Sequence, residues 1–102
     1  MRSEAAFQAK IAKFLRGEGF LVIKNQASAS MPKGFPDLSW WYKRRHGFLE
    51  VKASADSEFQ PLQPEWIARL SEHCLARVVY PENWEEIKAL LMQIKEEEDG
   101  SK

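Results

Sequence analysis

Two acidic residues and a lysine stand at spacings that suit metal-assisted hydrolysis. Asp37 lies in the segment Gly-Phe-Pro-Asp-Leu, and Glu50 and Lys52 are two residues apart in Glu-Val-Lys. Side chains two apart on a strand leave the same face, so Glu50 and Lys52 would point to one spot. With Asp37 close by, that spot would combine two carboxylates and an ammonium. Such a group can hold a divalent cation and place a water beside it.

The charges themselves indicate which ion and which reaction are favoured. Two carboxylates about 4 Å apart repel each other by roughly 4 kcal/mol at an effective dielectric of about 20, and a shared proton, Lys52 or a cation must offset this. Oxygen ligands favour Mg²⁺ or Mn²⁺, whereas His46, His73 and Cys74 do not form a zinc-ligand set. Lys52 would orient the water and stabilise developing negative charge, which suits phosphodiester hydrolysis. A simpler interpretation stays open, in which Lys52 only neutralises Glu50 on an ordinary charged strand.

Hydrophobic periodicity and turn residues predict the elements that must position these groups. In chain order they are a helix over 3–16, strands over 20–24, 38–42 and 48–53, a helix beginning at Pro61 or Pro64, a strand over 75–80 and a helix over 83–95. This order predicts an α/β domain with a mixed sheet. Glu4 falls on the apolar face of the first helix, where an acid needs a partner. We expect one domain over 1–95 and a disordered charged tail over 96–102.

Length and composition limit the class of protein. A chain of 102 residues is long enough for one small domain with a modest core. A single cysteine excludes an internal disulfide framework and fits a reducing compartment. No apolar run approaches the roughly 20 residues of a membrane helix, and the charged N-terminus is unlike a signal peptide. We therefore expect a cytoplasmic protein with no membrane partner.

The charge is zero overall but unevenly distributed. Residues 1–52 hold ten Lys and Arg against four Asp and Glu, a net charge of +6, whereas residues 53–102 hold five against eleven, a net charge of −6. The first half could therefore bind a polyanion such as DNA. The candidate DNA-binding residues are Lys43, Arg44 and Arg45 in a hairpin turn, and Lys24, Ser28, Ser30 and Lys33 in and around the loop over 25–36. For both segments, an ordinary exposed turn or loop is an equally good interpretation.

The motifs resemble those of a known group of nucleases. Pro36-Asp37 followed by Glu50-Val51-Lys52 is similar to the signature of the PD-(D/E)xK superfamily. That resemblance implies a restriction-endonuclease-like αβββαβ core, with a mixed central sheet flanked by helices and here followed by a C-terminal helix. More narrowly, the chain resembles the VRR-Nuc family, and especially its short stand-alone virus-type members. The matching segments span residues 4 to 80.

The resemblance implies a metal site. Asp37 and Glu50 would bind Mg²⁺ or Mn²⁺ together with the backbone carbonyl of Val51. Glu4 would be an outer acid that reaches the metal through water.

The same resemblance implies that Lys52 is the catalytic lysine and that Gln63 anchors the site. The chain departs from the family in two places. His73-Cys74 stands where the family often has a glycine at the end of the second helix, and residues 77–79 hold only part of a Val-Arg-Arg-like signature.

The expected function is that of a Mg²⁺- or Mn²⁺-dependent DNA endonuclease that recognises DNA shape and backbone rather than base sequence. Similarity to the virus-type members implies a homodimer that resolves branched DNA such as Holliday junctions, and a bacterial or phage origin. Two alternatives stay open. One is a monomeric flap or nicking nuclease, and the other is a catalytically inactive nucleic-acid-binding module.

Overall fold

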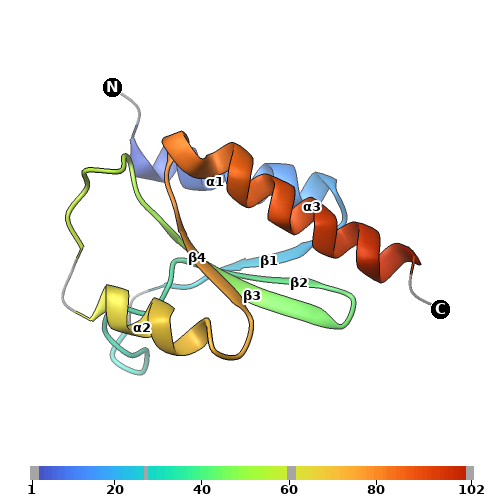
Figure 1. Ribbon diagram of the computed structural model, residues 1–102. Coiled ribbons are helices and arrows are strands. Elements are labelled where there is room, and N and C mark those ends of the chain that lie inside the picture. The colour runs from blue at the N-terminus through green and yellow to red at the C-terminus, as the bar shows by residue number, and fades with distance from the viewer. Residues whose placement is uncertain (1–2, 27, 60–61, 101–102) are drawn as a thin grey trace.

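The protein folds as a sheet between helices. The computed structural model describes residues 3–26, 28–59 and 62–100. Its elements are α1 (Glu4–Gly17), β1 (Leu21–Lys24), β2 (Leu38–Tyr42), β3 (Arg45–Val51), α2 (Gln63–Leu70), β4 (Leu75–Val79), the 3-10 helix η1 (Pro81–Asn83) and α3 (Trp84–Gly100). Figure 1 shows their arrangement. The predicted α/β class and the order of helices and strands are confirmed.

The sheet is mixed, as the sequence predicts. Among the described residues, four strands pair in the order β1-β2-β3-β4. β1, β2 and β3 are successive antiparallel strands, whereas β4 pairs parallel to β3. Parallel neighbours need a crossover connection, and α2 supplies it between β3 and β4.

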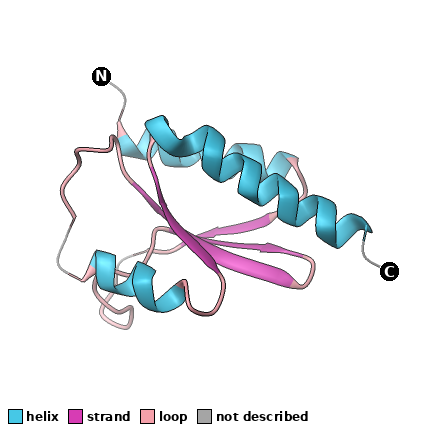
Figure 2. Cartoon of the chain, in the orientation of Figure 1, coloured by secondary structure: helices cyan, strands magenta, loops and turns pink. Residues whose placement is uncertain are grey.

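The helices form two layers on the sheet. α1 and α3 lie along one face, and α2 lies on the other (Figure 2). α2 contacts β3 and β4, so it leaves the same face of β1 and β2 without a covering helix. Glu50 and Lys52 lie on the face that α2 covers, where both contact Gln63 of this helix.

The core lies between the sheet and the α1–α3 layer. Phe7, Ile11 and Leu15 recur every four residues along α1 and are buried there. Each buried side chain of this size contributes about 1.5–3 kcal/mol relative to exposure. From the strands, alternate residues face the same core, and they include Val22, Leu38, Trp40, Leu49, Val51 and Val79. Because Leu49 and Val51 face this core, strand alternation directs Glu50 to the opposite face.

Several element boundaries differ from the predictions, most of them by one or two residues. The starts of β3 and α2 have local causes. β3 begins at Arg45 rather than at 48, because the hairpin turn is short, with Lys43 in the left-handed region at φ 52°. α2 begins at Gln63, after Leu62 at φ 77°. Of the two prolines predicted to open this helix, Pro64 lies in its first turn and Pro61 lies outside the described residues.

The predicted disordered tail is wrong for residues 96–100. α3 continues past Lys95 to Gly100, and residues 101–102 lie outside the described range. The extra turns are held by ion pairs between acids of this segment and the β2–β3 hairpin. These pairs are Lys43–Asp99, Arg44–Glu98 and Arg45–Glu97, which we call the hairpin pairs. The sequence could not predict them because the partners are more than 50 residues apart.

Among the described helices, none combines the length and the apolar character that a membrane-spanning helix needs.

Candidate active site

Glu50 and Lys52 are buried charged residues near the end of β3. Glu50 is 1% exposed and Lys52 is 6% exposed. Charged side chains are almost never buried this deeply unless they are paired. The Lys52 ammonium lies 3.7 Å from Glu50 Oε2, and the predicted convergence of these two residues is therefore present.

Gln63 links the two charges. Lys52 Nζ donates to Gln63 Oε1 at 2.8 Å, and Gln63 Nε2 donates to Glu50 Oε2 at 2.9 Å. An amide can accept from an ammonium and donate to a carboxylate at once, which fixes which way the Gln63 amide is turned. The position of Gln63 in the first turn of α2 couples this helix to the strand that carries the charges.

The Lys52 ammonium has two further neighbours. It donates to the Glu58 carbonyl at 3.2 Å and lies 5.0 Å from the centroid of the Phe59 ring. The loop after β3 therefore covers the amine on one side, while Gln63 and Glu50 hold it on the other. A lysine held at so many points is fixed in place before any ligand arrives.

Asp37 reaches the same spot from the segment before β2. Its Oδ2 accepts from the backbone N–H of Val51 at 2.8 Å, between Glu50 and Lys52 in the chain. The Asp37 carboxylate also raises the pKa of Glu50, both through its charge and through a hydrogen bond. The structure thus brings together Asp37, Glu50, Lys52 and Gln63, which we call the carboxylate cluster.

Asn25 fixes the backbone that carries Asp37, a role that was not predicted from the sequence. Its N–H donates to the Asp37 carbonyl at 2.7 Å, and its Nδ2 donates to the Pro36 carbonyl at 2.9 Å. The same side chain exchanges hydrogen bonds with the buried Ser39 hydroxyl. A serine between Leu38 and Trp40 in an apolar strand was the available clue, because a buried hydroxyl needs a partner.

Gly34 sets the distance between the Asp37 loop and α2. It has φ +81°, and a Cβ added there would lie 2.8 Å from the Leu62 carbonyl carbon and 2.9 Å from Gln63 N. Only glycine tolerates both the left-handed backbone and this close approach. Gly34 therefore lets the loop pack directly on the backbone that presents Gln63.

The electrostatics of Glu50 are unusual. Burial, the charge and hydrogen bond of Asp37, and the charge of Glu4 raise the pKa of Glu50 from 4.5 to about 8, although Lys52 opposes the shift. Glu50 Oε1 is buried and receives no hydrogen bond from any residue that the structure describes. With one nearby ammonium for two carboxylates, the cluster favours uptake of a proton or a cation.

Glu4 and Val51 occupy positions compatible with their predicted roles. Glu4 is exposed at the start of α1, and its charge is near enough to raise the pKa of Glu50. The N–H and C=O of a strand residue face the same neighbour. Because the Val51 N–H donates to Asp37, the Val51 carbonyl faces the side on which Asp37 lies.

The donor set fits a hard dication. Mg²⁺ is commonly held by one or two carboxylates and retains several waters. The unpartnered Glu50 Oε1 and the neighbouring Asp37 carboxylate supply such oxygens. Within the described residues, no group of three or more His, Cys, Asp or Glu side chains is placed to hold a metal ion. An ion here would therefore depend on this pair, the Val51 carbonyl and water.

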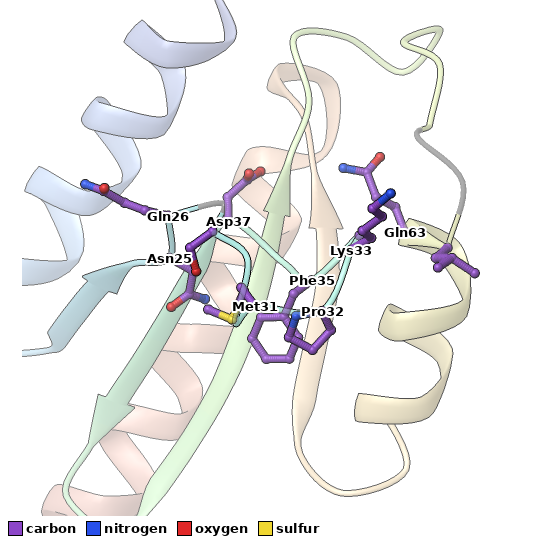
Figure 3. A pocket seen from close by; sticks show the side chains of 11 residues that line it. Asn25, Gln26, Met31, Pro32, Lys33, Phe35, Asp37 and Gln63 are labelled. Carbon is purple, nitrogen blue, oxygen red and sulfur yellow. The ribbon is translucent and has the colours of Figure 1, made fainter.

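A cavity of about 850 Å³ opens beside the cluster (Figure 3). The loop after β1 and the start of α2 line it, and Asp37 and Gln63 belong to its wall. Of the predicted DNA-binding residues, Ser28 and Lys33 line this cavity. Lys24 and Ser30 are exposed, and Ser30 Oγ lies 3.2 Å from Ser28 Oγ.

The other predicted DNA-binding segment lies elsewhere. Lys43, Arg44 and Arg45 follow β2, whereas Asp37 precedes it, so the length of a five-residue strand, ~16 Å, separates them. All three cations take part in the hairpin pairs. Tyr42 joins them by donating to Asp99 at 2.6 Å, which raises the pKa of Tyr42 to about 12.

Comparisons with known proteins give no further assignment. A scan against protein-family models, a search of curated proteins and a search of solved structures each found no match. The site must therefore be interpreted from its own geometry and from the motif resemblance described above.

Proposed function

We propose that this protein is a Mg²⁺- or Mn²⁺-dependent endodeoxyribonuclease. The observation that carries the proposal is the carboxylate cluster. It holds a buried and a half-buried carboxylate side by side, a Glu50 oxygen that receives no hydrogen bond from the described residues, and a lysine fixed beside them. Perturbed ionisable groups beside a cavity favour a catalytic role over a structural one. The motif Asp37, Glu50 and Lys52 further supports phosphodiester hydrolysis.

Each residue of the cluster has a proposed task. Asp37, Glu50 and the Val51 carbonyl would hold the ion, with Glu4 acting through water. When bound, the ion would polarise the phosphodiester and lower the pKa of a water. Lys52 would orient that water and stabilise the negative charge that develops on the phosphate.

Gln63 and Asn25 are proposed as positioning residues. Gln63 holds the Lys52 ammonium and Glu50 in a fixed relation by its two hydrogen bonds. Asn25 holds the backbone at Pro36 and Asp37. The geometry of the carboxylate cluster depends on both residues even if neither contacts the DNA.

The motif resemblance and the sheet topology support a more specific class of nuclease. The order αβββαβ, with three antiparallel strands and a parallel fourth, is that expected of a restriction-endonuclease-like core. We propose a VRR-Nuc-like nuclease that acts on branched DNA, such as Holliday junctions, as a homodimer. The exposed side chains of Leu21, Ile23 and Trp41, on the face of β1 and β2 that α2 leaves open, support a contact with a second copy.

The test is a cleavage assay with four-way junction, flap and plain duplex DNA in Mn²⁺, combined with sedimentation. The proposal predicts symmetric nicking of the junction by a dimeric protein. If the protein is a monomer that prefers flap substrates, it is a flap nuclease and not a junction-resolving enzyme. If the protein binds DNA tightly but cuts none of these substrates, it is a DNA-binding module and not an enzyme.

A further inference from the structure

The cavity beside the carboxylate cluster has walls of a distinctive chemistry. Met31, Pro32, Phe35 and Leu62 supply apolar surface, whereas Gln26, Ser28 and Lys33 supply polar groups. Among the described residues that line it, Lys33 is the one cation. A surface that binds only the phosphate backbone is lined by Lys and Arg. This cavity has instead the composition and size of a site for a compact, mostly uncharged ligand.

Phe35 gives the cavity a rigid aromatic wall. Its ring meets Phe48 edge-on at a centroid distance of 5.4 Å and Trp66 at 5.3 Å. These contacts hold the ring in place before a ligand arrives. Figure 3 shows the Phe35 ring beside Pro32 and Met31, which also line the cavity. A fixed aromatic ring is the kind of surface on which a nucleobase stacks, whatever its sequence.

The cavity is continuous with the proposed cleavage site. Asp37 and Gln63 belong both to its wall and to the carboxylate cluster. A group in the cavity therefore lies next to the position of the phosphate that would be cut. In DNA, the uncharged planar group nearest to a phosphate is the base of the flanking nucleotide.

We propose that this cavity receives an unpaired nucleobase that flanks the scissile phosphate. This inference rests on the proposed nuclease function and adds a selection rule to it. A base must leave its stack to enter, and this requires least energy where the base is already unpaired. The cavity would thus favour cutting at branch points, flaps or mismatches over cutting within intact duplex.

The test uses two neighbouring substitutions in the same exposed loop. Ser28→Phe adds a phenyl ring at the cavity wall, because Ser28 lines the cavity, whereas Ala29→Phe adds the same side chain to an exposed residue outside its lining. The probe is a four-way junction with 2-aminopurine placed in turn at each position around the cut, bound in Ca²⁺. This base becomes more fluorescent when it is unstacked from its neighbours.

We expect fluorescence to rise at one position with the wild type and A29F, and not with S28F. S28F should also cut the intact junction about tenfold to a hundredfold more slowly in Mn²⁺, the range that base–aromatic stacking supplies for one base. On a junction that is abasic at the same position, S28F and A29F should cut at equal rates.

Two results would overturn the inference while leaving the nuclease in place. One is junction cleavage by the wild type with no fluorescence rise at any position. The other is S28F cutting both junctions as fast as A29F does. Failure of the wild type to cut any DNA in Mn²⁺ would instead overturn the proposed function, and the base-binding cavity with it.

Discussion

Two groups of charged side chains lie at opposite ends of β2, and they are built differently. In the hairpin pairs, each cation faces one carboxylate, and all three cations are exposed. In the carboxylate cluster, one buried lysine pairs with Glu50 while Asp37 lies beside them, and Glu50 Oε1 receives no hydrogen bond from the described residues. Balanced surface pairs each contribute at most about 1 kcal/mol and lengthen α3. An unbalanced buried group lowers stability, which favours a functional reason for its presence.

The largest effect should follow from removing the lysine of the cluster. Lys52→Ala should lower the rate of junction cleavage by about 10²–10³-fold, the usual loss when one preorganised charge stabiliser is removed. Lys88→Ala is the matched control, because Lys88 pairs with Glu85 on α3 and lies outside the cluster. Single-turnover rates in Mn²⁺ measure both. Equal rates for the two variants would leave Lys52 as only a structural partner of Glu50.

The packing of the loop on α2 can be tested at Gly34. Gly34→Ala should lower the free energy of unfolding by up to about 3 kcal/mol, because φ +81° and the contact with the Leu62 backbone both oppose a Cβ. Cleavage should fall as well, since Gln63 would be displaced. Gly17→Ala is the control, because a Cβ there meets nothing within 4 Å. Denaturant unfolding that gives the same loss for both variants would contradict the close approach.

The stability that the protein loses when Glu50 is ionised can be measured. Its pKa is about 8 in the folded protein against an ordinary 4.5, so between these values the folded state binds more protons than the unfolded state. Stability therefore falls as pH rises through this window. Glu50→Gln should remove that loss and be more stable than the wild type near pH 8, with no cleavage activity.

The control for this prediction is Glu97→Gln, which neutralises an exposed acid of the hairpin pairs. Thermal unfolding at several pH values should show the stability of E50Q relative to the wild type rising with pH, and E97Q should show no such rise. A difference that is the same at pH 4 and pH 8 for E50Q would mean that Glu50 titrates normally.

The smallest effect concerns the hairpin pairs. The combined variant E97Q/E98Q/D99N should lose about 1 kcal/mol of stability at low salt and less at high salt. If the turn over 43–45 contacts DNA, freeing its cations should also tighten DNA binding. Fluorescence anisotropy with junction DNA measures this. Unchanged affinity would remove this turn from the DNA-binding surface.

Much of the site could be predicted because it follows from short-range rules. Strand alternation places Glu50 and Lys52 on one face once Leu49 and Val51 are assigned to the core. The order of elements then brings the segment before β2 to the side of β3, which delivers Asp37. Neither step needs knowledge of distant contacts.

The features that were missed depend on contacts between distant segments. The role of Asn25 requires its pairing with Ser39 across the β1–β2 connection. The length of α3 depends on a hairpin far away in the chain. The cavity wall at Leu62 depends on a left-handed backbone that a leucine rarely adopts. Sequence patterns carry little information about any of these.

The most direct measurement is calorimetric titration of Mn²⁺ into the wild type and into Asp37→Asn. Because the pKa of Glu50 is about 8, metal binding at pH 7 should release close to one proton, seen as a heat that varies with the ionisation enthalpy of the buffer. We expect this uptake and proton release for the wild type and their loss in D37N. Absence of Mn²⁺ binding by the wild type, or equal binding by D37N, would contradict it.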